Sequence, residues 1–69
     1  MTTNLTKANI LKSLEGSEYG HTVVTLTAAL EWIGIYANGR TIRTALAELR
    51  SEGKARRTVG NLGLRHFAI

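Results

Sequence analysis

The chain has 69 residues, no cysteine and a formal net charge of +4 at neutral pH. This length predicts a single domain over residues 1–69 with room for only a small apolar core. The absence of cysteine excludes a disulfide framework and a thiolate metal site. The sequence has no run of about 18 apolar residues and no secretory signal at its start, so we expect a cytoplasmic protein without a membrane span.

The positive charge is concentrated in the second half of the chain. Residues 1–37 carry two lysines and three glutamates, a net charge of −1, whereas residues 38–69 carry seven lysines or arginines and two glutamates, a net charge of +5. No acidic residue follows Glu52. This asymmetry favours a polyanionic partner on one side of the molecule, with a merely solvated basic surface as the alternative.

Residues 4–15 predict the first helix, which ends at Gly16. Its apolar residues recur at helical spacing and form the expected inner face: Leu5, Ala8, Ile10, Leu11 and Leu14. After a turn at residues 17–20, the β-branched segment 21–24 predicts a short strand. A strand this short requires a partner strand elsewhere in the chain.

Residues 25–33 predict the second helix, with Thr25 as its N-cap and Gly34 at its end. Its expected inner stripe consists of Leu26, Ala29, Leu30 and Ile33. Trp32 lies off this stripe, so we expect it to cover the edge of the core, with a dimer contact as the alternative. Ile35, in the turn that follows, is expected to fill the core.

The third helix is predicted from its N-cap Asn38 to about Glu52, and Gly53 ends it. One buried face follows the helical repeat: Ile42, Ala45, Leu46 and Leu49. The rest of the chain predicts a β-hairpin of strands 54–59 and 64–69 around a glycine-rich turn at 60–63. Phe67 and Ile69 are expected to pack this hairpin against the helices.

This order of elements resembles the winged helix-turn-helix family of DNA-binding domains. The segments that carry the resemblance are Val24–Leu26, Leu30, Ile33–Ile35, Arg40–Leu46, Leu49 and Glu52–Lys54. The resemblance covers nearly the whole chain and implies an α+β fold of three helices, a short strand and a C-terminal β-hairpin wing. The connection at 35–39 is about two residues longer than the family's usual turn of three or four.

The resemblance implies a non-catalytic protein that binds double-stranded DNA, such as a small transcriptional regulator of phage or plasmid type that acts as a homodimer. The third helix then enters the major groove, and the basic wing contacts the DNA backbone. The candidate nucleic-acid-binding residues lie at helix starts, on the third helix and in the wing: Thr25, Asn38, Gly39, Arg40, Thr41, Arg43, Thr44, Lys54, Arg56, Arg57, Asn61 and Arg65.

Two pairs of arginines carry the chemistry of this prediction. Arg40 and Arg43 lie three positions apart on one helix, and an arginine can donate two parallel hydrogen bonds to guanine. Their alternative role is that of solvated surface residues. Arg56 and Arg57 point to opposite faces of a strand, so both cannot serve equally in phosphate contact. A basic edge strand that resists pairing with other strands is the alternative.

Other residue types give little support for different functions. The two histidines, His21 and His66, lack neighbouring acids or cysteines, and no phosphate-binding or dinucleotide motif is present. We therefore expect no enzyme, no metal, no cofactor and no small-molecule ligand. His66 is expected to be structural or at most a phosphate donor, and Arg50 to complement the helix dipole. A protein-interaction module for an acidic partner and a structured-RNA binder are the alternatives to DNA.

Overall fold

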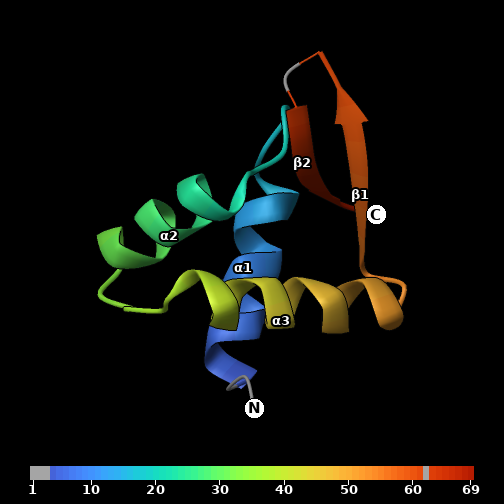
Figure 1. The fold of residues 1–69 in the computed structure, drawn as a ribbon. Coiled ribbons are helices and arrows are strands. Elements are labelled where there is room, and N and C mark those ends of the chain that lie inside the picture. Colours follow the sequence, from blue (N-terminus) through green and yellow to red (C-terminus); the bar gives the residue numbers. More distant parts are fainter. Residues whose placement is uncertain (1–3, 62) are drawn as a thin grey trace.

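The computed structural model describes residues 4–61 and 63–69 and has an α+β fold (Figure 1). Three helices precede an antiparallel two-stranded hairpin: α1 (Asn4–Glu15), α2 (Val23–Trp32), α3 (Gly39–Ser51), β1 (Ala55–Gly60) and β2 (Gly63–Ala68). This order is compatible with a winged-helix-like layout. In the described ranges, no helix is long and apolar enough to cross a membrane.

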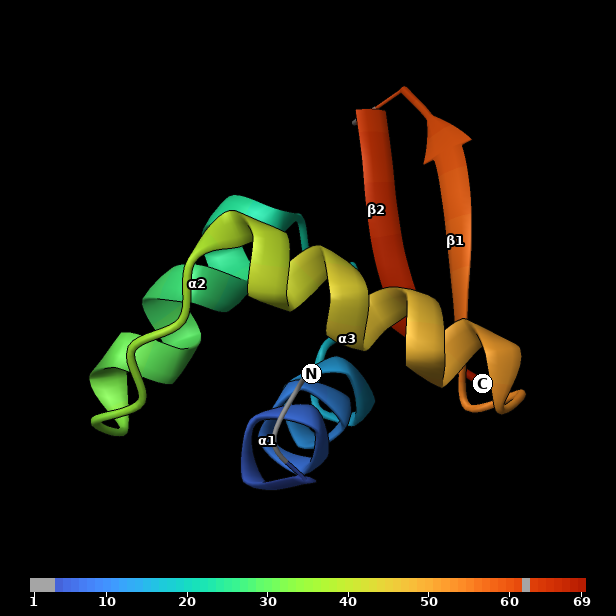
Figure 2. The same ribbon diagram turned by 60° about the horizontal axis from the view of Figure 1, so that its bottom comes forward.

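The core is built around α3, which crosses over α1 and contacts α2, α1 and the base of the hairpin (Figures 1 and 2). Its predicted inner face is confirmed, because Ile42, Ala45, Leu46 and Leu49 are all buried. The helices α1 and α2 supply the other large core residues, which are Ile10, Leu14, Leu26 and Leu30. Ile35 packs against this cluster from the α2–α3 connection, as predicted.

The inner face of α1 differs from the prediction. Thr6, Ile10 and Leu14 are buried, whereas Leu5 is 65% exposed and Ala8 is also exposed. An α-helix turns by about 100° per residue, so positions three apart drift by about 60° per step and positions four apart by only about 40°. The row with four-residue spacing therefore stays on one face, and this face packs against α2 and α3.

The segment 21–24 was predicted to be a strand, and this prediction is wrong apart from His21. His21 forms a single antiparallel bridge with His66 of β2, with N···O distances of 2.9 and 2.7 Å. The N-cap of α2 is Thr22, not Thr25. The Thr22 Oγ1 accepts from the Thr25 amide, and the Thr25 Oγ1 accepts from the Thr22 amide. This capping box draws the two intervening valines into the first helical turn, which outweighs their preference for strands.

Both α2 and α3 end as predicted, at Gly34 and Gly53. Each glycine has a positive φ, 84° and 74°, which is the left-handed conformation that residues with a Cβ rarely adopt. In both cases the residue after the glycine donates its amide back into the helix, from Ile35 to Leu30 at 2.8 Å and from Lys54 to Leu49 at 2.9 Å. Each of these hydrogen bonds belongs to a Schellman motif, which fixes the direction in which the chain leaves the helix.

The hairpin is confirmed, with strands shifted by one residue from the predicted bounds. Gly60 pairs with Gly63, so the connection is shorter than the predicted glycine-rich turn. The register also places Arg57 opposite His66 and Arg56 opposite Phe67. Because side chains alternate along a strand, the first pair shares one face of the hairpin and the second pair shares the other.

Several apolar residues expected in the core are at the surface instead. Trp32 is 90% exposed, Ile33 is 54% exposed and Ile69 is 76% exposed. The core faces of α2 are fixed by Leu26 and Leu30, which places Trp32 on the outer side of the last turn and leaves Ile33 in the cap. Phe67 is half-buried, whereas Ile69 follows the last strand and lies at the surface, with its amide donating to the Lys54 carbonyl.

The capping box makes a prediction for stability. Thr22→Ala removes the hydroxyl that accepts from the Thr25 amide, so the free energy of unfolding should fall by about 1 kcal/mol. Thr44→Ala is the matched control, because Thr44 is exposed and its hydroxyl bonds only to the Arg40 carbonyl within its own helix. Urea unfolding followed by circular dichroism measures the free energy of unfolding of both variants. Equal losses in the two variants would contradict the role of Thr22.

Candidate nucleic-acid interface

The face of α3 that points away from the core carries small polar or apolar residues and one arginine. Arg40, Thr44, Ala47 and Ser51 are all exposed along this face. Thr44 Oγ1 donates to the Arg40 carbonyl at 3.0 Å, which leaves its oxygen free to accept a further bond. Since the side chains of Thr44, Ala47 and Ser51 are short, the backbone of α3 is accessible to a partner along this face.

The start of α3 keeps the predicted cap. Asn38 Oδ1 accepts from the Thr41 amide at 2.8 Å. A Cβ added at Gly39 would lie only 3.3 Å from Nη1 of Arg43 and 3.6 Å from Cγ1 of Val23. Gly39 therefore leaves room for the Arg43 guanidinium beside the first turn of the helix, where unpaired amides already give a positive potential.

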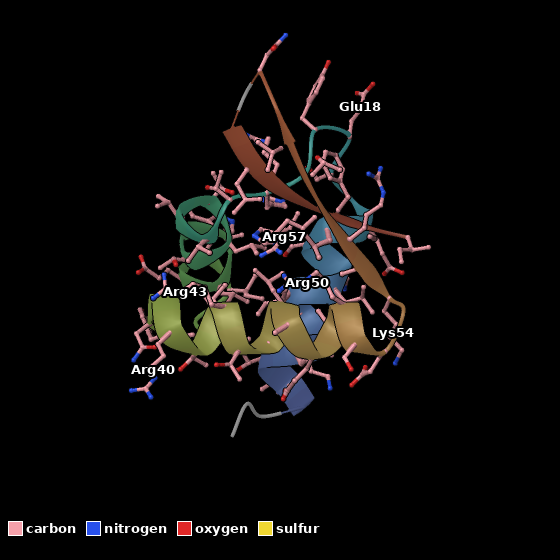
Figure 3. All side chains as sticks on the ribbon, turned by 45° about the vertical axis from the view of Figure 1, so that its right-hand side comes forward. Glu18, Arg40, Arg43, Arg50, Lys54 and Arg57 are labelled. Atoms are coloured by element: carbon pink, nitrogen blue, oxygen red, sulfur yellow. The ribbon has the colours of Figure 1, made fainter. Side chains whose placement is uncertain are left out.

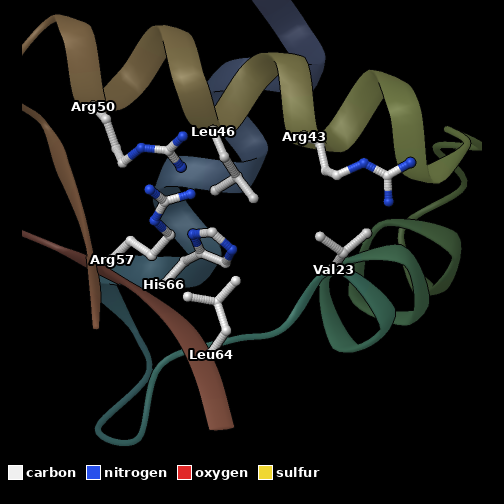
Figure 4. Close-up of a pocket in the computed structure, with 7 residues that line it drawn as sticks. All are labelled: Val23, Arg43, Leu46, Arg50, Arg57, Leu64 and His66. Carbon is white, nitrogen blue, oxygen red and sulfur yellow. The ribbon is translucent and has the colours of Figure 1, made fainter. Parts of the chain in front are cut away.

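A cavity of about 130 Å³ lies between α3, the start of α2 and the hairpin (Figure 4). Its apolar lining comes from Val23, Leu46 and Leu64, and its polar lining comes from Arg43, Arg50, Arg57 and His66. Arg43 and Arg50 reach it from the same side of α3, because they are two helical turns apart. Arg57 and His66 reach it from the hairpin, where they are cross-strand partners.

The arginines of α3 and β1 have no carboxylate partner in the described part of the chain. The ion pairs there are Lys7 with Glu52 and Lys54 with Glu52, the latter at 3.5 Å. The hydrogen bond from Lys7 also lowers the pKa of the Glu52 carboxyl. Figure 3 shows Arg50 and Arg57 between α3 and the hairpin and Arg43 nearer to α2, with Lys54 at the opposite end of α3 from Arg40. Glu52 therefore balances lysines and leaves these arginines uncompensated.

Two other predicted site residues, Thr25 and Arg65, make hydrogen bonds that support the fold. Thr25 is part of the capping box, and its Oγ1 lies 3.0 Å from Nδ1 of His21. Arg65 donates to the carbonyl of Tyr19 at 2.8 Å and to that of Gly20 at 3.3 Å, which ties the hairpin to the loop before α2.

The outer part of the hairpin holds the remaining candidates. Arg56 stacks over the Phe67 ring, with 4.6 Å between its Cζ and the ring centroid. This contact lies on the face of the hairpin that carries neither Arg57 nor His66. Asn61 is exposed at the hairpin tip. The two adjacent arginines of β1 therefore have different surroundings, as the alternation of side chains predicted.

The sequence-based site omitted Arg50 and His66, both of which line the cavity. The seven-residue interval between Arg43 and Arg50 was a usable signal, because it places both on one side of a helix. His66 could not be found in this way. Its position depends on the register of the hairpin and on its bridge to His21, which joins residues far apart in the sequence.

His66 is the polar residue most deeply buried at this cavity, with 5% of its surface exposed. Its Nδ1 is buried without a hydrogen-bond partner. Burial lowers the pKa of the imidazole below its ordinary value, and the charges of Arg50 and Arg57 lower it further. The neutral form of His66 is therefore favoured in the folded protein.

Comparison of the chain with known protein families, with curated proteins and with solved structures finds no match in any of the three. Among residues 4–61 and 63–69, no group of three or more His, Cys, Asp or Glu side chains is placed to hold a metal ion. The geometry and charge of α3 and the hairpin are therefore the basis for a functional assignment.

The lowered pKa of His66 makes a prediction for pH dependence. The unfolded chain binds a proton at this residue near pH 6.5, whereas the folded chain binds it only at lower pH. Unfolding therefore takes up a proton between these values, and the free energy of unfolding should fall as the pH drops below about 6.5. Urea unfolding at about pH 7.5 and about pH 5.5 measures this slope.

Substitution of each histidine tests whether His66 causes this change of the free energy of unfolding with pH. His66→Gln should flatten it, whatever its effect on absolute stability, because no titrating group remains at the buried position. His21→Gln is the matched control and should keep the slope, since His21 is bonded to Thr25 outside the cavity. An unchanged slope in His66→Gln would refute the assignment.

Proposed function

We propose that this chain is a non-catalytic winged helix-turn-helix domain that binds double-stranded DNA and acts in the cytoplasm as a small transcriptional regulator. The observation that carries the proposal is the position of Arg40, Arg43, Arg50 and Arg57 on α3 and the facing side of the hairpin, with no carboxylate partner among the described residues. Duplex DNA carries one negative charge per about 1.7 Å of its axis, so it is a natural counterpart for such a surface.

The shape of α3 supports insertion into the major groove. This groove is about 12 Å wide and admits an α-helix. The small side chains of Thr44, Ala47 and Ser51 let the helix approach the bases closely. Arg40 and Arg43 lie in its first two turns, which is the part of a recognition helix that contacts base edges. In this pose Arg57 and the hairpin reach the phosphates beside the groove.

A single domain of this size offers little contact area for specific binding. We propose that two copies occupy a site with two-fold symmetry, with the two recognition helices about one helical turn of DNA apart. The ratio of protein chains to duplex in the complex, measured by native mass spectrometry, tests this part of the proposal.

The recognition helix is tested by combining Arg40→Ala with Arg43→Ala. Each arginine that contacts a base should contribute about 1–3 kcal/mol to binding, so the affinity for selected duplexes should fall by at least about tenfold and the base preference should relax. Fluorescence anisotropy with labelled duplexes at about 50 mM salt measures both, because phosphate contacts are strong there. Lys12→Ala is the control, since Lys12 is an exposed cation on α1. Unchanged affinity in the double variant would make the recognition-helix proposal wrong.

The hairpin is tested by a matched pair of neighbouring arginines. Arg57→Ala should weaken binding to all sequences alike and reduce the slope of log affinity against log salt by about one, because a single phosphate contact is lost. Arg56→Ala removes the same charge from the opposite face of β1 and should leave the slope nearly unchanged. Salt titrations of both variants on one duplex give the slopes. The reverse result would place the other face of the hairpin on the DNA.

One observation favours a second candidate, a protein-interaction domain. Trp32 and Tyr36 are 90% and 82% exposed, and they lie in the last turn of α2 and the connection to α3. Tryptophan, tyrosine and arginine are enriched at protein interfaces, and the net charge of this chain suits an acidic partner. Failure to retain any duplex at about 50 mM salt favours this candidate over DNA.

A further inference from the structure

We propose that the cavity between α3 and the hairpin is a binding site for a phosphate group. The cavity is the one lined by Arg43, Arg50, Arg57 and His66 (Figure 4). The proposal rests on the lining of this cavity and not on the DNA-binding proposal, because a free ion can occupy it without any contact to the outer face of α3. It adds a site for a specific ligand to a protein for which the sequence predicted no small-molecule ligand.

The charge of the lining favours an anion. In Figure 4 the guanidinium groups of Arg50 and Arg57 lie next to one another beside His66, whereas Arg43 lies beyond Leu46, near the start of α2. None of the three has a carboxylate partner in the described ranges. Like charges held around a small apolar-walled space repel one another, and an anion between them turns this repulsion into attraction. Guanidinium groups remain charged at any physiological pH, so they cannot relieve the repulsion by losing a proton.

The size of the cavity suits a small polyatomic ion. A cavity needs about 10–15 Å³ to hold one water, and this one measures about 130 Å³. Leu46 and Leu64 form apolar walls, and an apolar surrounding strengthens charge-assisted hydrogen bonds. The cavity therefore has the volume to hold an ion of several atoms such as phosphate.

The buried imidazole is the second observation that points to a ligand. His66 is 5% exposed and lines the cavity, and its Nδ1 has no hydrogen-bond partner among residues 4–61 and 63–69. A buried polar group without a partner is unfavourable and marks a place where a ligand commonly binds. An anion beside His66 stabilises the protonated ring, which then donates from both nitrogens.

The charge and the number of acceptor oxygens distinguish a phosphate from a carboxylate as the ligand of this site. A phosphate monoester carries up to two negative charges and three terminal oxygens, whereas a carboxylate has one charge and two oxygens. Arginine forms bidentate hydrogen bonds with phosphate, so two guanidinium groups occupy most of the acceptor sites on the phosphate oxygens. With the guanidinium groups of Arg50 and Arg57 side by side, a carboxylate leaves more of the positive charge uncompensated than a phosphate does.

Inorganic phosphate is the probe for this site. At constant ionic strength, adjusted with sodium chloride, phosphate should produce a saturable shift of the His66 imidazole resonance in nuclear magnetic resonance spectra and should raise the pKa of His66. The chain has two histidines, so the His21 resonance, from a ring bonded to Thr25, is an internal reference that should not respond.

Three matched arginine variants assign the response to the cavity. Arg50→Gln and Arg57→Gln should each weaken phosphate binding by at least about tenfold, because each loses a charge-assisted bond. Arg56→Gln removes the same charge from the other face of the hairpin and should bind phosphate as the natural chain does. Dispersed amide spectra of each variant show that it is folded. A shift that does not saturate, or equal phosphate binding in Arg50→Gln and Arg56→Gln, would overturn the proposal.

Arg40→Ala separates this inference from the DNA-binding proposal. This variant should lose duplex affinity and keep phosphate binding, since Arg40 does not line the cavity. A chain that binds phosphate but no duplex supports the cavity proposal alone, and a chain that binds duplex but no phosphate overturns it.

The source of the phosphate group follows from competition. If saturating phosphate displaces duplex DNA at constant ionic strength, the cavity holds a phosphate of the DNA backbone. If both bind together, the cavity holds a free phosphorylated molecule. Either result supports a phosphate site.

Discussion

The rotation of α3 about its own axis is the constraint on which the rest of the structure depends. Four apolar residues, Ile42, Ala45, Leu46 and Leu49, must all be buried, and only one rotation of a helix with 3.6 residues per turn achieves this. The same rotation turns Arg40 and the small residues outward and directs Arg43 and Arg50 toward the hairpin. Packing of the core thus decides which arginines of α3 line the cavity.

The second constraint is the anchoring of the hairpin at the middle of β2 and at the base of β1. The bridge between His21 and His66 and the hydrogen bonds from Arg65 to Tyr19 and Gly20 hold β2 against the loop before α2. Ala55 adds a buried contact from β1 to the core. The tip of the hairpin extends beyond the helices, as Figure 1 shows. These contacts hold the face of the hairpin that carries Arg57 and His66 beside the cavity.

These two constraints together place like charges close to one another in a small protein. Chains of this size bury only about 60% of the surface exposed on unfolding, so their net stability is small and each unfavourable contact matters. Arg50, Arg57 and a buried, neutral His66 form such a contact. Natural proteins commonly accept this kind of local cost at sites that bind a ligand of opposite charge.

Much of the fold could be predicted from local patterns. The first helix over residues 4–15, the cap at Asn38, the buried face of α3 and the helix ends at Gly34 and Gly53 depend on neighbouring residues, and all are confirmed. The predictions that failed concerned competition between local signals. The valines after Thr22 favour a strand by themselves, but the capping box recruits them into α2. The burial of Trp32 failed because apolar character alone does not fix the side of a helix that packs.

The sequence by itself determined the three helices, the hairpin and the excess of positive charge after residue 37, because these follow from periodicity, caps and composition. Among the candidate site residues, it predicted Arg40 and Arg43 on α3 and the opposite orientations of Arg56 and Arg57. Only the tertiary structure decided that Arg50, Arg57 and His66 line one cavity. Their meeting depends on the packing of α3 against the hairpin and on a cross-strand register, which are contacts between residues distant in sequence that no local pattern encodes.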